Sequence, residues 1–266
     1  MKNLITQTIV LFTIVNGVHA ESLQGEWKGS YILNAYVNRI NLYVLEEDNQ
    51  FSATLDAIDA NAMDLSYEIQ ANGDSVRFSR INSQGDLIEF SGVRTEGIIT
   101  GMVVLHNEWM KDKPGIFQLM KSNATIFKGL QLPTFTLSSV DNLTLNQETG
   151  QDKYVIWDFW ATWCKPCVAK RPMLTELKES FGGKLEIVSI SLDDDWDVVE
   201  EFRKEKYPMP WLHAIKSKKW EDPLIQKFVP EGLPYGYLVS PEGKVVAFGS
   251  QLHAENIMDT VTKHLK

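Results

Sequence analysis

The pattern of apolar residues changes near Pro133, and this change constrains the fold more than any other feature of the chain. Before it, short strand-like runs alternate with turn residues, and no helical period is present. After it, strand-like runs alternate with segments of helical period. The 266 residues are enough for two modest domains. The sequence therefore predicts two domains of different structural class.

Residues 21–122 are predicted to form an all-β domain, an antiparallel meander or a small barrel. Gly-containing turns at residues 72–74, 84–86 and 96–97 separate its runs, where the backbone must be left-handed or flexible. The even spacing is typical of such all-β folds. The opening Leu-Gln-Gly-Glu-Trp-Lys-Gly at residues 23–29 resembles the start of lipocalin-like domains, which implies a fold and no activity. The predicted strands are 31–33, 39–45, 51–55, 65–69, 75–78, 87–90, 98–105 and 115–119.

Residues 123–133 are predicted to be a linker, and residues 134–266 a second, α/β domain. A strand–helix–strand unit followed by a hairpin and a last helix is typical of a layered α/β architecture. The predicted strands are 154–160, 185–192, 235–239 and 244–248, and the predicted helices are 165–181, 196–206 and 254–265.

The first twenty residues resemble a signal peptide. Lys2 supplies a positive charge, residues 4–15 are mostly apolar, and Val18-His19-Ala20 suits cleavage after Ala20. The apolar stretch is short for a spanning helix of about 20 residues, so an uncleaved membrane anchor is the less favoured alternative. We expect an exported protein, with the bacterial periplasm as its compartment. The formal charge of −9 argues against a nucleic-acid partner, which would need a basic face.

The only two cysteines, Cys164 and Cys167, stand three positions apart. A disulfide that closes so small a loop contributes little stability, so redox chemistry explains the pair better. Cys164 falls between a predicted strand and a predicted helix, where free backbone N–H groups favour a thiolate. Lys165 adds a nearby positive charge, and Pro166 suits the first helical turn. We predict that Cys164 is the attacking nucleophile and Cys167 the resolving thiol.

The run Trp-Asp-Phe-Trp-Ala-Thr-Trp-Cys-Lys-Pro-Cys at residues 157–167 resembles the thioredoxin fold, and in particular the exported TlpA/ResA-like thiol–disulfide oxidoreductases. The resemblance extends over roughly residues 130–266. It implies a reductase of protein disulfides in an oxidising compartment, supplied with electrons by a membrane partner. Protein disulfides or thiols would be its substrates, and no cofactor is expected. The same residues can run in reverse as an oxidase or isomerase, depending on the redox potential.

The resemblance also implies roles for residues outside the cysteine pair. Asp158 matches a buried carboxylate that accepts the proton of the resolving thiol, and we expect burial to raise its pKa. The lysine that thioredoxins pair with this carboxylate has no counterpart, because Ser189 occupies its place. Pro172 matches a kink in the active-site helix.

Three further residues are predicted to contact the substrate. Pro234, in Leu233-Pro234-Tyr235, matches the cis-proline loop that faces the cysteines and offers its backbone to the substrate. Leu233 belongs to the same loop. Trp163, next to the nucleophile, is expected to shape the surface around it.

The cysteine pair and the N-terminal domain each have an alternative interpretation. A zinc site would need further ligands, but the chain has no third cysteine, and its histidines after residue 20 show no paired spacing, so no metal site is predicted. The other alternative makes the N-terminal β domain a ligand- or protein-binding module, with the thioredoxin-like half as its scaffold. The sequence does not indicate an oligomeric state.

Overall fold

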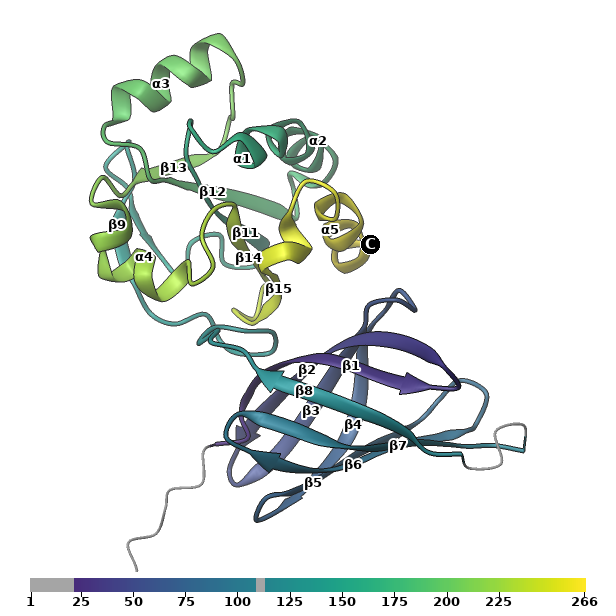
Figure 1. Cartoon of the computed structure of the whole chain (residues 1–266). Coiled ribbons are helices and arrows are strands. Elements are labelled where there is room, and N and C mark those ends of the chain that lie inside the picture. Colours follow the sequence, from purple (N-terminus) through teal and green to yellow (C-terminus); the bar gives the residue numbers. More distant parts are fainter. Residues whose placement is uncertain (1–21, 109–112) are drawn as a thin grey trace, which may run out of the picture.

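The computed structural model describes residues 22–108 and 113–266, which form a β-barrel and an α/β domain (Figure 1). The predicted signal peptide, residues 1–20, lies outside the described residues. Within the described part of the chain, no helix is both long enough and apolar enough to cross a membrane.

Eight antiparallel strands form a closed barrel, in which each strand pairs with the next and β8 pairs with β1. All eight strands predicted from the sequence lie within these elements, so the predicted all-β fold is confirmed, in its barrel form. The strands are β1 Gly25–Leu33, β2 Tyr36–Glu47, β3 Gln50–Ala57, β4 Ala62–Asn72, β5 Ser75–Ile81, β6 Leu87–Thr95, β7 Ile98–His106 and β8 Gly115–Lys121.

Aromatic side chains fill the centre of the barrel. Phe78 and Phe90 stack with ring centroids 4.5 Å apart, and Phe117 meets both rings edge-on. Tyr67 packs against the same pair, and all four side chains are buried. Because these rings contact one another, a ligand in the lumen would have to displace them.

Glycines allow neighbouring strands of the barrel to approach closely. A β-carbon on Gly29 would overlap the carbonyl oxygen of Gln118, and one on Gly101 would overlap that of Ser91. Only glycine can occupy these two positions without moving the neighbouring strand.

The α/β domain is built on a five-stranded sheet with the order β13-β12-β11-β14-β15. The central strand β11 runs parallel to β12 and antiparallel to β14. A separate hairpin, β9 Thr136–Ser138 and β10 Thr144–Asn146, precedes the sheet. The sheet strands are β11 Tyr154–Trp160, β12 Leu185–Ser191, β13 Leu212–Ile215, β14 Tyr235–Val239 and β15 Val245–Phe248. The helices are α1 Lys165–Ala169, α2 Arg171–Phe181, α3 Trp196–Glu205, α4 Pro223–Phe228 and α5 Ile257–Leu265, with short 3-10 helices η1 Lys219–Glu221 and η2 Gly249–Leu252.

The helix predicted over residues 165–181 is divided into α1 and α2 at Lys170. Pro172 lies in the first turn of α2 and has no N–H to continue the hydrogen-bond ladder of α1. The division matters for the site, because it turns the side chains of Lys170 and Arg171 toward the sheet.

Alternate residues of β11 point to opposite faces of the sheet. On one face, Asp158 contacts Arg171 of α2, and Trp160 packs against Phe202 of α3. On the other face, Phe159 packs against Phe228 of α4. The active-site helices and α4 therefore cover opposite faces.

A cluster of polar and charged side chains, buried at Asp56 and Lys128, joins the two domains. Asp56 of β3 is 0% exposed, and both of its oxygens bind Nζ of Lys128, at 2.9 and 3.1 Å. Gln251 of η2 donates to the same carboxylate at 3.1 Å. Asp64 of β4 binds Lys263 of α5, which faces the barrel in Figure 1. We call these five residues the interdomain cluster; it connects the barrel, the linker and the α/β domain.

Candidate active site

Cys164 and Cys167 lie at the start of α1 and are joined by a disulfide with an S–S distance of 2.02 Å. Cys164 is the N-cap residue, and its Sγ accepts a hydrogen bond from the backbone N–H of Cys167 at 3.3 Å. Cys164 is 6% exposed, whereas Cys167 is fully buried. After reduction, the same N–H group would face a thiolate on Cys164, which favours the charged form.

Several of the residues beside the cysteine pair are exposed to solvent. Trp163 is 53% exposed, so its ring is available to a partner next to Cys164. Pro166 occupies the first turn of α1, and Lys165 is exposed at its start. The chain just before Trp163 is held by Asp193, which accepts from both the backbone N–H and the hydroxyl of Thr162. Asp193 was not predicted from the sequence as part of the site.

The peptide bond between Leu233 and Pro234 is cis. Phe159 of β11 pairs with Tyr235 of β14, so Pro234 lies at the end of β11 from which the chain continues to Cys164. The fold therefore brings the predicted proline loop to the same edge of the sheet as the cysteines. The role of Leu233 and Pro234 in substrate binding stays a prediction.

Asp158 is fully buried beneath α1 and carries two cations. Nζ of Lys170 lies 2.6 Å from Oδ1, and Nη2 of Arg171 lies 2.6 Å from Oδ2. The hydroxyl of Ser189 donates to Oδ2 at 3.1 Å. Arg171 also reaches the cysteine pair, because its Nε donates to the carbonyl oxygen of Cys167 at 3.1 Å.

The expected raised pKa of Asp158 is wrong. Burial alone would raise it, but the positive charges of Arg171 and Lys170 outweigh burial and lower the pKa to about 2. Neither cation was predicted from the sequence, because the partner of the buried carboxylate was expected at the position of Ser189. The signal was present, since Lys170 and Arg171 directly precede Pro172, where the helix was expected to bend.

Further polar residues continue this row of the sheet. Ser189 pairs with Asp158 on one side and with His213 on the other. The indole N–H of Trp211 donates to the Ser189 hydroxyl at 2.9 Å. His213 is buried, and burial lowers its pKa to about 4, so it is neutral near neutral pH.

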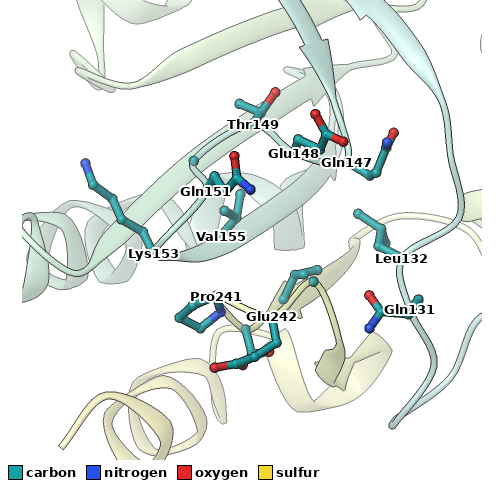
Figure 2. A pocket seen from close by; sticks show the side chains of 14 residues that line it. Gln131, Leu132, Gln147, Glu148, Thr149, Gln151, Lys153, Val155, Pro241 and Glu242 are labelled. Atoms are coloured by element: carbon teal, nitrogen blue, oxygen red, sulfur yellow. The ribbon is translucent and has the colours of Figure 1, made fainter.

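A polar pocket of about 230 Å³ lies at the opposite end of β11 from the cysteines. Lys153 and Val155 line it at the start of the strand, whereas Cys164 follows the end of the strand, about 20 Å away at the usual rise per residue. Figure 2 shows the loop 147–151 on one side of the pocket and Gln131 and the 240–243 turn on the other. The pocket is therefore separate from the cysteine site. Among the described residues, no group of three or more His, Cys, Asp or Glu is placed to hold a metal ion.

Comparison with known proteins identifies the family. The family model for thioredoxin-like proteins matches residues 151–245. Thiol-disulfide oxidoreductase ResA of Bacillus thuringiensis is 27% identical over 139 residues, which are 52% of this chain and 76% of the relative. ResA of Oceanobacillus iheyensis is 33% identical over 135 residues, covering 47% of this chain and 67% of the relative. The chain belongs to the thioredoxin-like thiol–disulfide oxidoreductases. The resemblance inferred from residues 157–167 is thereby confirmed.

The stretch that the family model matches lies within the α/β domain. Among solved structures, the thioredoxin domain of a thiol-disulfide oxidoreductase from Bacteroides vulgatus covers 53% of this chain and 100% of its own, with 24% identity and a TM-score of 0.46. The barrel lies outside the stretch that the family model matches.

Proposed function

We propose that this oxidoreductase reduces disulfides of protein substrates through the Cys164–Cys167 pair in an extracytoplasmic compartment. The observation that supports this most is the position of Cys164, at the start of α1 with the N–H of Cys167 directed at its sulfur. The names of the relatives as thiol-disulfide oxidoreductases support the reaction class.

The reaction proceeds in two exchanges. In the reduced pair, the Cys164 thiolate attacks one sulfur of the substrate disulfide, forming a mixed disulfide and releasing the other substrate sulfur as a thiolate. Cys167 then loses its proton and attacks Sγ of Cys164, which releases the second substrate thiolate. The pair gives up two electrons and two protons, and the substrate gains two thiols. The disulfide form described above is the product state of this cycle.

The proton-acceptor role expected of Asp158 requires a carboxylate that takes up a proton near neutral pH. The low pKa that Arg171 and Lys170 impose disfavours this role. Trp163, Leu233 and Pro234 are proposed to contact the substrate, since the exposed indole and the proline loop lie at the same edge of the sheet as Cys164.

Insulin reduction tests the proposal. The native protein should reduce insulin in the presence of a thiol donor, and Cys164→Ser should abolish the activity. Cys167→Ser should instead accumulate a mixed disulfide with the substrate, because the resolving thiol is missing. Lys204→Gln, on the exposed side of α3, is the matched control and should retain full activity. A native protein that fails to reduce insulin would contradict the proposal.

The direction of the reaction and the source of electrons are separate proposals. We propose a reductase supplied by a membrane partner, which requires a potential well below that of strong oxidants such as DsbA, about −120 mV. The equilibrium of the pair with glutathione measures this potential. A value near that of the strong oxidants would favour an oxidase.

The barrel as a binding module is the second proposal. The lumen is filled with aromatic rings, so a ligand would have to bind on the outside of the barrel. An open cleft of about 680 Å³ on the barrel surface favours this second function. A barrel with this role would keep its binding activity in Cys164→Ser, whereas disulfide exchange would be lost. The cleft is lined by Asp64, Leu65, Ser66, Tyr67, Glu68, Ser79, Arg80, Ile81 and Leu87.

A further inference from the structure

The charges beneath the cysteine pair do not cancel. Near neutral pH Asp158 supplies one negative charge, and Lys170 and Arg171 each supply a positive one, so the cluster has a net charge of +1. Burial lowers the pKa of Lys170, and the neighbouring charge of Asp158 opposes this shift. None of the three side chains is more than 1% exposed. A buried charge is screened far less by solvent than an exposed one, so an unbalanced charge acts strongly on its neighbours.

The guanidinium of Arg171 is bonded to the backbone of Cys167, and Lys170 is bonded there through its own backbone, while its charged Nζ contacts Asp158. Arg171 donates through Nε to the Cys167 carbonyl oxygen, while its Nη2 holds Asp158. The backbone N–H of Lys170 donates to the same carbonyl at 3.2 Å, one turn after the cysteine. The guanidinium also lies 4.6 Å from the centre of the Trp160 ring, which covers it on that side.

We propose that Lys170 and Arg171 are positioning residues that place one unbalanced positive charge behind Cys167 and thereby stabilise the thiolate form of the reduced pair. This inference rests on the proposed thiol–disulfide exchange at Cys164 and Cys167. In this arrangement Asp158 holds the two cations in place. Their unbalanced charge then stabilises the thiolate.

The other charged groups near the site do not cancel this charge by direct contact. His213 of β13 lies on the same row of the sheet and is neutral near neutral pH, since burial lowers its pKa to about 4. Arg203 of α3, which acts on His213, adds a further positive charge. Asp193 is negative, but Thr162 and Ser191 bind its oxygens on the loop side of the site. Lys165 is exposed to solvent at the start of α1.

The equilibrium between the protein and glutathione tests the proposal. In this reaction the disulfide form and two glutathione molecules give the dithiol form and glutathione disulfide, so two electrons and two protons enter the protein. Lys170→Gln removes one charge and keeps an amide donor for Oδ1 of Asp158. Because loss of one positive charge from the buried cluster beneath the pair should raise the pKa of the thiol by about one unit, we expect the equilibrium constant for reduction to fall about tenfold. A tenfold fall corresponds to about 30 mV.

Two comparisons separate charge from structure. Lys204→Gln removes an exposed lysine of α3 and should leave the constant within about twofold of native. The double variant Asp158→Asn with Lys170→Gln leaves Arg171 as the only charge of the cluster, +1 as in the native protein, and should return toward the native constant. A purely structural role predicts that the double variant departs further than the single one.

The thiolate absorbance of the reduced protein gives a second measurement. Lys170→Gln should move its titration to higher pH, whereas Lys204→Gln should not. If Lys170→Gln does not fold, Asp158→Asn removes the negative charge instead, and the equilibrium constant must then rise. A native constant in Lys170→Gln, or a fall in Asp158→Asn, would overturn the proposal. A native protein that never exchanges with glutathione would instead refute the proposed function.

Discussion

The interdomain cluster gives the sharpest prediction on stability, through the variant Lys128→Met. Asp56 is 0% exposed, and Nζ of Lys128 is its only bonded cation among the described residues. The hydroxyl of Tyr43 and the amide of Gln251, each at 3.1 Å, are neutral donors and would remain. The variant therefore leaves a buried carboxylate without its counter-charge, and it also removes the ion pair between Lys128 and the partly exposed Asp64.

Removing one partner of a buried ion pair costs about 3–5 kcal/mol. This is a large part of the roughly 5–15 kcal/mol that stabilises a typical protein. The matched control is Lys204→Met, which breaks an exposed i,i+4 pair with Glu200 and should leave stability close to native. Adding Asp56→Asn to Lys128→Met should recover part of the loss, because the unpaired charge is then gone.

Urea unfolding followed by tryptophan fluorescence measures these free energies of unfolding. The expected order is Lys204→Met close to native, the double variant Lys128→Met with Asp56→Asn in between, and Lys128→Met lowest. A loss of less than about 1 kcal/mol in Lys128→Met, no larger than in the control, would refute the view that the buried pair joins the domains.

Three further predictions concern other parts of the molecule. Burial lowers the pKa of His213 from 6.5 to about 4, so between these pH values the unfolded chain binds a proton that the native chain does not bind. The free energy of unfolding should therefore fall by roughly 3 kcal/mol as the pH drops from 6.5 to 4. Urea unfolding of His213→Gln should show a smaller fall. Gly101→Ala should lower stability by about 1–3 kcal/mol in thermal unfolding, because the new β-carbon overlaps the Ser91 carbonyl, whereas Gly183→Ala meets open space and should not. Trp163→Ala should lower kcat/KM for insulin about tenfold and leave the glutathione equilibrium unchanged, since the exposed ring is proposed to contact the substrate and not the sulfur atoms; equal losses in both assays would contradict this.

Long elements with a clear period could be predicted from the sequence. In β5, Val76 and Phe78 are buried while Ser75 and Arg77 are exposed, an alternation that the sequence displays directly. The strands β9, β10 and β13 have only three or four residues, which is too few to show a period. Helix α4, with six residues, was missed for the same reason.

The residues of the site also fall into those that the sequence could predict and those that it could not. The positions of Cys164, Cys167 and Pro234 in the fold could be predicted, because their signals lie within a few consecutive residues. The partners of Asp158 could not, since they depend on how α1 and α2 meet the sheet at Lys170. The pKa of Asp158 was assigned the wrong direction because burial was visible in the sequence and the two cations were not.

The central claim is that Cys164 is an activated thiolate and Cys167 a protected resolving thiol. Alkylation of the fully reduced protein over a range of pH, with each cysteine followed separately by mass spectrometry, tests it most directly. We predict that Cys164 is modified first and reacts at half its maximal rate well below about pH 8.5, the ordinary range for a free thiol. Equal rates at the two cysteines, or a half-maximal rate at the ordinary thiol value, would contradict the account.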